Sequence, residues 1–296
     1  MKSGILVLSV ALSLPAGSED LKTQPAPLYR VTVVGRAAKV VNYGHRGRPT
    51  KIDFRGTVLL PETRGEATVQ STLGAVQIDT RFKRLDPPTR FGREYLTYVL
   101  WALTPDGRAA NLGEIVTDED NRGRLKVTTQ LQAFALIVTA EPHFAVTQPS
   151  NVVVLENVLR KDTEGKVEDL EVKYELLSRG DYTFHADSSA GHHRRPESER
   201  KVSLDQYEAL LALYQARNAL QIARAEGAGQ YARETFQKAE RLLADAESHQ
   251  AGRAGTRLVV TTAREAAQTA EDARAISAKR RELEQLARQQ PAGEQR

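Results

Sequence analysis

The sequence contains no cysteine, and this absence excludes several kinds of chemistry. Without cysteine there are no disulfide bonds, no thiolate nucleophiles and no cysteine-ligated zinc sites. Lipid attachment at an N-terminal cysteine is excluded as well, so we do not expect a lipoprotein. Aromatic residues are scarce, at 6% of the 296 residues, whereas a surface that stacks the bases of single-stranded nucleic acid needs several of them.

No charge of one sign dominates the chain. It has 42 Lys and Arg residues against 38 Asp and Glu residues, for a net charge of +4. Nucleic-acid-binding proteins concentrate their basic residues on one face or along one helix. We therefore expect no nucleic-acid partner.

Catalytic motifs are missing too. The sequence has no G-x-S-x-G, no H-E-x-x-H, no P-loop and no G-x-G-x-x-G. The carboxylates Asp118, Glu119 and Asp120 cluster beside Asn and Gly residues typical of a turn, a poor position for a general acid or base. We expect no enzyme activity and no cofactor.

One group of residues has the chemistry of metal ligands. His185, Asp187, His192 and His193 lie close together in the sequence, and such side chains can bind Zn or Cu. However, the Ser, Gly and Pro residues around them predict a flexible linker over 179–201. Because a metal site needs a rigid frame, we predict no metal.

No later run of apolar residues is long enough for a transmembrane helix, but the N-terminus has a short one. Lys2 precedes the apolar run Gly4–Leu14, and Ala16 and Ser18 are small residues at the −3 and −1 positions of a cleavage site. This pattern predicts a signal peptide over 1–18 and a periplasmic location, with the protein soluble or peripherally attached. The alternative is a buried strand or a frayed start of the chain.

Residues 28–178 have a strand-like pattern. The stretch 96–103 is apolar on both faces, which is typical of a strand in the middle of a layered β structure. Thr104-Pro105-Asp106-Gly107 follows it as a tight turn. Several short strands with regular turn signals predict an immunoglobulin-like β-sandwich, and Tyr174–Phe184 is a candidate for additional edge strands.

Residues 202–290 have a helical period instead. Small and apolar residues recur at spacings of three and four in three segments, and Gly227 or Gly229 ends the first of them. Alanine seams joined by short connections predict an antiparallel helical hairpin or three-helix module. The predicted fold class is α+β in separate modules, and 291–296 form a disordered tail.

Part of the helical half resembles a known family. Ala216-Arg217-Asn218-Ala219, Gly227-Ala228 and Tyr231-Ala232 are similar to the Ala-x-x-Ala rhythm, Gly-Ala turn and Tyr-Ala helix start of the domain of unknown function 4398 family. That resemblance implies a helical hairpin of a bacterial envelope protein, often placed before an OmpA-type peptidoglycan-binding domain. The sequence ends after the third helix, so we expect only indirect contact with peptidoglycan.

The β half has a second resemblance. The stretches "YVLWALTPDGRAANLGEI" and "VTAEPHFAVTQPSNVVVLEN" resemble the β-sandwich ends of anti-sigma-K factors. Because the membrane helix and sigma-binding part of those proteins have no counterpart here, the resemblance implies the sandwich fold alone. Neither family supplies a catalytic residue.

Two groups of residues are candidates for interaction. Ile276, Leu283 and Leu286 form a stripe at spacings of seven and three, close to a coiled-coil pattern, and they either bind a partner or pack inside the helical module. The second group, Arg46, Arg48 and Lys51, lies within the basic stretch from Arg30 to Arg55. This stretch either contacts a polyanion or is a solvated hairpin.

These observations favour an exported, non-enzymatic envelope protein with a scaffolding or protein-interaction role. Its C-terminal helices would bind an envelope protein or a second copy of the chain. The alternative is a β-sandwich that binds envelope glycans or other polyanions through the Arg30–Arg55 face.

The signal-peptide prediction can be checked directly. We expect export to remove residues 1–18, because Ala16 and Ser18 satisfy the cleavage rule. N-terminal sequencing of the mature protein should read from Glu19. Mature protein that begins at Met1 would contradict the prediction.

Overall fold

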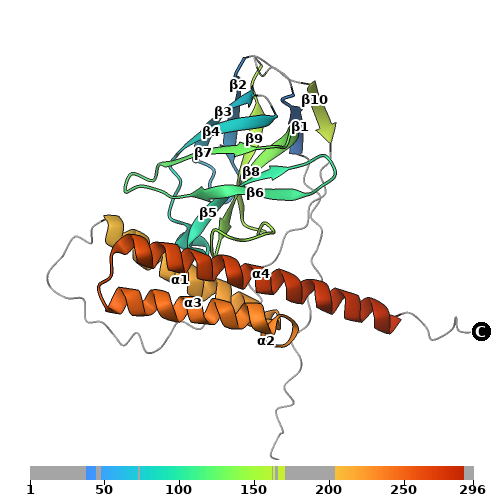
Figure 1. Cartoon of the computed structure of the whole chain (residues 1–296). Coiled ribbons are helices and arrows are strands. Elements are labelled where there is room, and N and C mark those ends of the chain that lie inside the picture. Colours follow the sequence, from blue (N-terminus) through green and yellow to red (C-terminus); the bar gives the residue numbers. More distant parts are fainter. Residues whose placement is uncertain are drawn as a thin grey trace, which may run out of the picture. The chain divides into compact units, whose positions relative to one another are not determined.

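The computed structural model describes residues 38–44, 48–72, 74–161, 163, 166–170 and 204–289. They form a β region (38–170) followed by a helical region (204–289), as Figure 1 shows. The predicted order of a β part and then an α part is confirmed. The predicted signal peptide, linker and C-terminal tail lie outside the described residues, as do the four candidate metal ligands and Tyr174–Phe184.

Ten strands make up the β region. Their bounds are β1 (Ala38–Asn42), β2 (Thr50–Gly56), β3 (Arg64–Thr72), β4 (Ala75–Lys83), β5 (Thr97–Leu103), β6 (Ala109–Ile115), β7 (Gly123–Thr129), β8 (Ala133–Glu141), β9 (Val153–Leu159) and β10 (Lys166–Leu170), with a short 3₁₀ helix, η1 (Pro88–Phe91), before β5.

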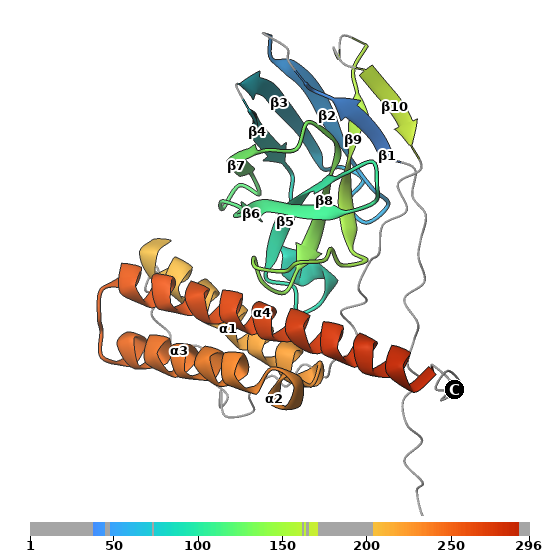
Figure 2. The same cartoon turned by 45° about the vertical axis from the view of Figure 1, so that its right-hand side comes forward.

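The strands form one antiparallel sheet that nearly closes on itself. Hydrogen-bonded neighbours run in the order β10-β1-β8-β9-β2-β3-β4-β7, and β8 also pairs with β5, which pairs with β6. A bridge between Thr117 and Gly123 then brings the end of β6 beside β7. Figure 2 shows the curved arrangement of these strands. The sheet thus surrounds its own core.

Strand β5 is buried on both faces, as the sequence predicts. Tyr98, Leu100 and Ala102 pack into the main core of the β region. Trp101 and its neighbours Val99 and Leu103 pack into a second, smaller core on the opposite face. The predicted turn follows β5, where the N–H of Gly107 donates to the carbonyl of Thr104 at 2.9 Å.

Four helices follow, with bounds α1 (Leu204–Ala225), α2 (Ala228–Tyr231), α3 (Arg233–Ala251) and α4 (Thr256–Gln289). Gly227, with a positive φ of 88°, ends α1, since glycine adopts this left-handed conformation without steric cost. Helix α4 packs along both α1 and α3, and its predicted alanine seam is fully buried at Ala263, Ala266, Ala270 and Ala273. The one-turn helix α2 is not predicted from the sequence.

None of the helices in the described ranges combines the length and apolar character that crossing a membrane requires.

Phe236 should contribute much of the stability of the helical region. It is 5% exposed and is the largest side chain among the buried residues of an alanine-rich core. We expect Phe236→Ala to lower the free energy of unfolding by about 3–5 kcal/mol, because it leaves a cavity. Urea denaturation followed by circular dichroism would measure this change.

Tyr207→Ala is the matched control, because Tyr207 is an aromatic residue of the same region that is 53% exposed. It should change stability by no more than about 0.5 kcal/mol. Equal effects of the two substitutions would contradict the assignment of Phe236 to the core.

Candidate interaction surfaces

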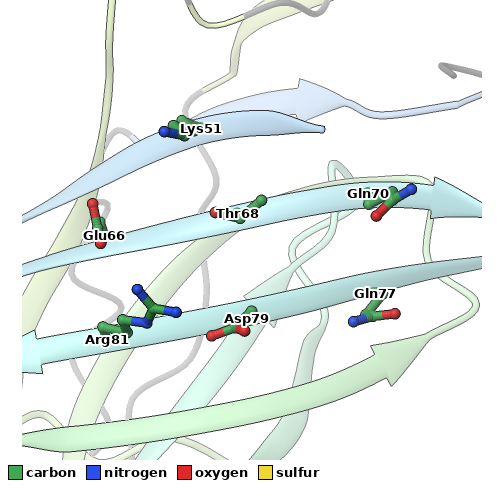
Figure 3. A pocket seen from close by; sticks show the side chains of 7 residues that line it. All are labelled: Lys51, Glu66, Thr68, Gln70, Gln77, Asp79 and Arg81. Carbon is green, nitrogen blue, oxygen red and sulfur yellow. The ribbon is translucent and has the colours of Figure 1, made fainter. Parts of the chain in front are cut away.

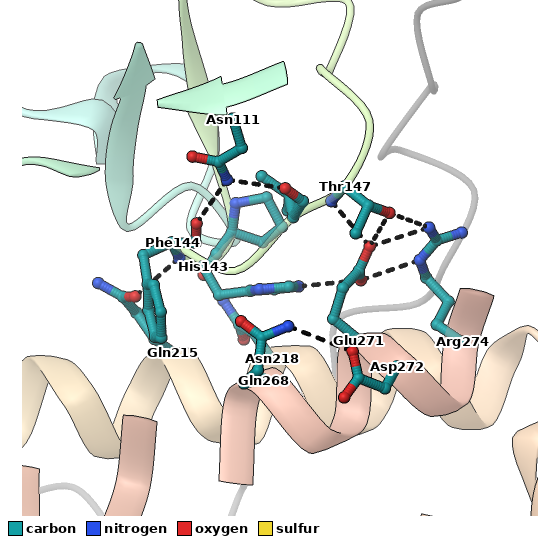
Figure 4. Close-up of polar contacts among 12 residues, drawn as sticks. Asn111, His143, Phe144, Thr147, Gln215, Asn218, Gln268, Glu271, Asp272 and Arg274 are labelled. Atoms are coloured by element: carbon teal, nitrogen blue, oxygen red, sulfur yellow. Dashed lines mark hydrogen bonds and ion pairs between the residues drawn. The ribbon is translucent and has the colours of Figure 1, made fainter. Parts of the chain in front are cut away.

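A loop of the β region packs on the helices. The β8–β9 loop (142–152) lies against α1 and α4, as Figure 4 shows. Its Phe144 packs against the core of the helical region, and the backbone N–H of Phe144 donates to Oε1 of Gln215 at 2.9 Å. Val146, two residues later, belongs to the second core of the β region. The loop therefore joins two hydrophobic cores.

A buried carboxylate of α4 holds the same loop. Oε1 of Glu271 accepts hydrogen bonds from the backbone N–H and the hydroxyl of Thr147, at 2.9 and 2.6 Å. Arg274 donates to both oxygens of Glu271 at 2.9 Å and also to Oγ1 of Thr147 at 2.9 Å. Nε2 of His143 lies 3.8 Å from Oε2 of Glu271. We call these four residues the buried clamp, after the burial of His143, Glu271 and Arg274; Thr147 itself is exposed.

The charges of the buried clamp depend on one another. Glu271 and Arg274 are 1% and 5% exposed, and a buried charge is tolerated only when it is paired and hydrogen-bonded. Burial alone would lower the pKa of Arg274, but the hydrogen bonds and negative charge of Glu271 outweigh it and raise the pKa above its ordinary value. The guanidinium therefore stays charged.

A second set of contacts lies on β6. Oε1 of Glu114 accepts a hydrogen bond from Gln215 of α1 at 2.6 Å, and Oε2 accepts one from Arg264 of α4 at 2.7 Å. The guanidinium of Arg264 also stacks over the ring of Phe144, 3.7 Å from its centroid. Asn218 of α1 adds hydrogen bonds to two backbone carbonyls of the β region.

The β region fixes its own loop from inside. Trp101 donates to Thr139 at 2.8 Å, and Thr139 donates to Oε1 of Glu141 at 2.5 Å. The same oxygen accepts the N–H of Ser150 at 2.6 Å, and Asn111 holds the loop carbonyls at 144 and 146. The surface that meets the helices is therefore already ordered by the sheet.

A cleft opens beside these contacts. It has a volume of about 430 Å³ and is lined by residues of β6, the β8–β9 loop and α4. The charged residues in its wall, Glu114 and Arg264, are paired with each other. No group of three or more potential metal ligands occurs in the described ranges. The charged groups of the cleft are therefore already paired with each other where β6 meets α4.

The three residues of the predicted polyanion contact lie in different environments. Arg46 lies outside the described residues, and Arg48 is exposed just before β2. Lys51 lines a hollow of about 280 Å³ on the outer face of β2, β3 and β4, which Figure 3 shows. Glu66 and Arg81 line the same hollow. Lys51 therefore lies on a polar surface that extends over β2, β3 and β4, beyond the Arg30–Arg55 stretch.

The three residues of the predicted stripe on α4 differ in burial. Ile276 is half-buried and packs against the core of the helical region. Leu283 and Leu286 are 53% and 50% exposed, near the C-terminal end of α4. The three residues therefore do not share one environment.

Sequence reasoning missed the residues of the buried clamp and of the Glu114 contacts. A signal was present, because Glu271 and Arg274 follow Ala267 at spacings of four and three and so continue a stripe of small residues along α4. Gln215 and Asn218 similarly follow Ala212 on α1. Polar residues that continue an alanine stripe indicate a buried polar contact.

A comparison of the chain with protein-family models, curated proteins and solved structures found no match.

The buried clamp generates a stability prediction. Glu271→Ala should destabilise the protein by about 3–5 kcal/mol, because it leaves the Arg274 charge buried without its carboxylate. Glu265→Ala removes an exposed glutamate from the same helix and should cost no more than about 1 kcal/mol. Urea denaturation would measure both.

Hydrogen exchange adds a local readout. In the Glu271→Ala variant, the amide of Thr147 should lose protection, since Glu271 is its acceptor. Unchanged protection of this amide, or equal stability of the two variants, would show that the clamp does not hold the interface.

Proposed function

We propose that the protein is a non-enzymatic scaffold of the cell envelope, in which the β region fixes the helical region and the end of α4 contacts a partner protein. The observation that carries this proposal is the contrast along α4. Its middle is held by the buried clamp, whereas Leu283 and Leu286 near its end are half exposed.

The anchoring of α4 supports a role in presentation. Arg281 donates to Glu226 at 2.6 Å, and Tyr231 donates to Glu284 at 2.7 Å, so the ends of α1 and α2 hold α4 as far as this turn. Leu283 and Leu286 are three residues apart and share one side of the helix. A firmly held helix loses little conformational freedom when it binds, which favours affinity.

The non-enzymatic part of the proposal draws on the pairing of the charged groups. Glu114 with Arg264 and Glu271 with Arg274 form ion pairs in the region where α4 meets the sheet. A general acid or base must instead be able to reach a substrate proton.

The envelope location comes from the predicted signal peptide and from the resemblance to the domain of unknown function 4398 family. We also propose that the strands of the β region have an immunoglobulin-like arrangement and that the Ala-rich helices form a hairpin of the kind found in this family. Contact with peptidoglycan would be indirect, through the bound partner.

The test uses the two exposed leucines. Replacing Leu283 and Leu286 with Ser should abolish partner contact without loss of stability, because both side chains are half exposed. A photo-crosslinking residue at Gln285, which is exposed between them, would report the contact in cells, and sedimentation would show whether the partner is a second copy.

Two controls make the test specific. Leu258→Ser changes a leucine at the other end of α4 that is 47% exposed and should leave the crosslink intact. Ile276→Ser should lower stability, since Ile276 packs against the helical core. A monomer that forms no crosslink through Gln285 would contradict the proposal.

A further inference from the structure

The outer face of β2, β3, β4 and β7 carries an excess of basic residues. Burial alternates along these strands, with apolar residues inside and polar residues outside. Residues paired across antiparallel strands point to the same face. The registers of the strands therefore show which outer side chains are neighbours.

Three rows of basic residues follow from these registers. In the first row, Arg55, Arg64 and Lys83 are direct cross-strand partners on β2, β3 and β4. In the second, Arg81 of β4 pairs with Arg124 of β7. Like charges directly opposite each other destabilise a sheet, so an anion bound over these rows would relieve their repulsion.

The third row contains Lys51 of β2 and Lys126 of β7. Between them lie Thr68 and Asp79. The three rows thus hold seven basic residues.

Three carboxylates share this face, and they are largely neutralised. Nη2 of Arg160 lies 2.5 Å from Asp53 and 3.5 Å from Glu66. The third carboxylate, Asp79, is the cross-strand partner of Lys126. In the first two rows, Glu66 is the cross-strand partner of Arg81, and Glu156 of β9 is that of Arg55. Arg64, Lys83 and Arg124 have no acidic cross-strand partner, so these rows keep an excess of positive charge.

The hollow beside these rows also contains hydroxyl, amide and carboxylate groups. Its lining includes Thr68, Gln70, Gln77 and Asp79 (Figure 3). Oδ1 of Asp79 is shielded from solvent by the neighbouring side chains and has no hydrogen-bond partner in the part of the chain that the structure describes. Hydroxyl, amide and carboxylate groups bind the hydroxyls of a sugar, whereas a carboxylate repels a phosphate or another carboxylate.

The composition of the face distinguishes between polyanions. Its paired positions on β2, β3, β4 and β7 carry no outward aromatic side chain, and nucleic-acid bases need aromatic residues to stack on. The partner must supply both negative charges and hydroxyl groups. We propose that this face binds a linear acidic polysaccharide, with its carboxylates over the basic rows and its hydroxyls in the Asp79 hollow.

The test measures binding of polygalacturonate to the full chain at about 0.15 M salt, where interactions between distant surface charges are screened. Neutral dextran and oligodeoxythymidylate are the comparison polymers. We expect polygalacturonate to bind more tightly than the oligonucleotide, and dextran not to bind. This surface is separate from the end of α4, so the result does not depend on the proposed scaffold function.

Two sets of charge substitutions locate the site. Replacing Arg64, Arg81, Lys83 and Arg124 with Gln should weaken binding of polygalacturonate by about tenfold or more. Replacing Arg233, Arg241 and Arg257 with Gln, which are exposed residues of the helical region, should change it by less than about twofold. If the fourfold variant melts below the wild type, the Arg81 and Arg124 pair alone serves as the test.

Asp79→Ala separates recognition from simple charge attraction. It removes a negative charge, so it should strengthen binding of the oligonucleotide. The same change should weaken binding of polygalacturonate, because alanine offers no acceptor for the sugar hydroxyls. Stronger binding of both polymers, equal affinity of the wild type for both, or equal losses in the two sets of charge variants would overturn the proposal.

Discussion

The arrangement of the helical region depends on the burial of one carboxylate, Glu271. A buried carboxylate needs several hydrogen bonds to offset the loss of water. Arg274 supplies two from the same helix, and Thr147 supplies two from the β8–β9 loop. Because both sources are required, α4 cannot separate from the loop without exposing the carboxylate of Glu271 to solvent or leaving it with too few hydrogen bonds. The contact is therefore specific in position, because separating the partners leaves a buried charge unpaired.

This demand on the loop explains the second core of the β region. A loop that presents Thr147 to α4 has to be held in position by the sheet. Val146 enters the core that contains Trp101, and Glu141 ties the far end of the loop at Ser150. Strand β5 is apolar on both faces because one face fills the main core and the other supports the loop. The buried clamp thus depends on the apolar pattern of both faces of β5, and this pattern is visible in the sequence.

The elements could be predicted from the sequence because their signals are local. The two-faced pattern of β5, the turn that ends at Gly107 and the alanine seam of α4 each lie within one segment. The joining of the regions could not, because Glu114 and Gln215 are separated by 101 residues. The position of Gln215 on the alanine stripe of α1 indicates a buried polar contact but does not identify its partner on β6. The same limit applies to the basic face, whose rows become visible only once the strand registers are known. Arg81 and Arg124 are neighbours through pairing between strands, and spacing along the chain gives no hint of it.

The protein thus uses charge in two opposite ways. Where α4 meets the sheet, Glu114 and Glu271 are each matched by an arginine and withdrawn from water, so this surface is already occupied. On the outer face of the sheet, Arg81 and Arg124 stand opposite each other, and the neighbouring Glu66 is paired with Arg160. Paired, buried charges fix the position of one part of the chain relative to another, whereas adjacent like charges in solvent carry a cost that an anionic partner can remove. This difference is the reason for proposing the sheet face, and not the interface with the helices, as the surface that binds a charged ligand.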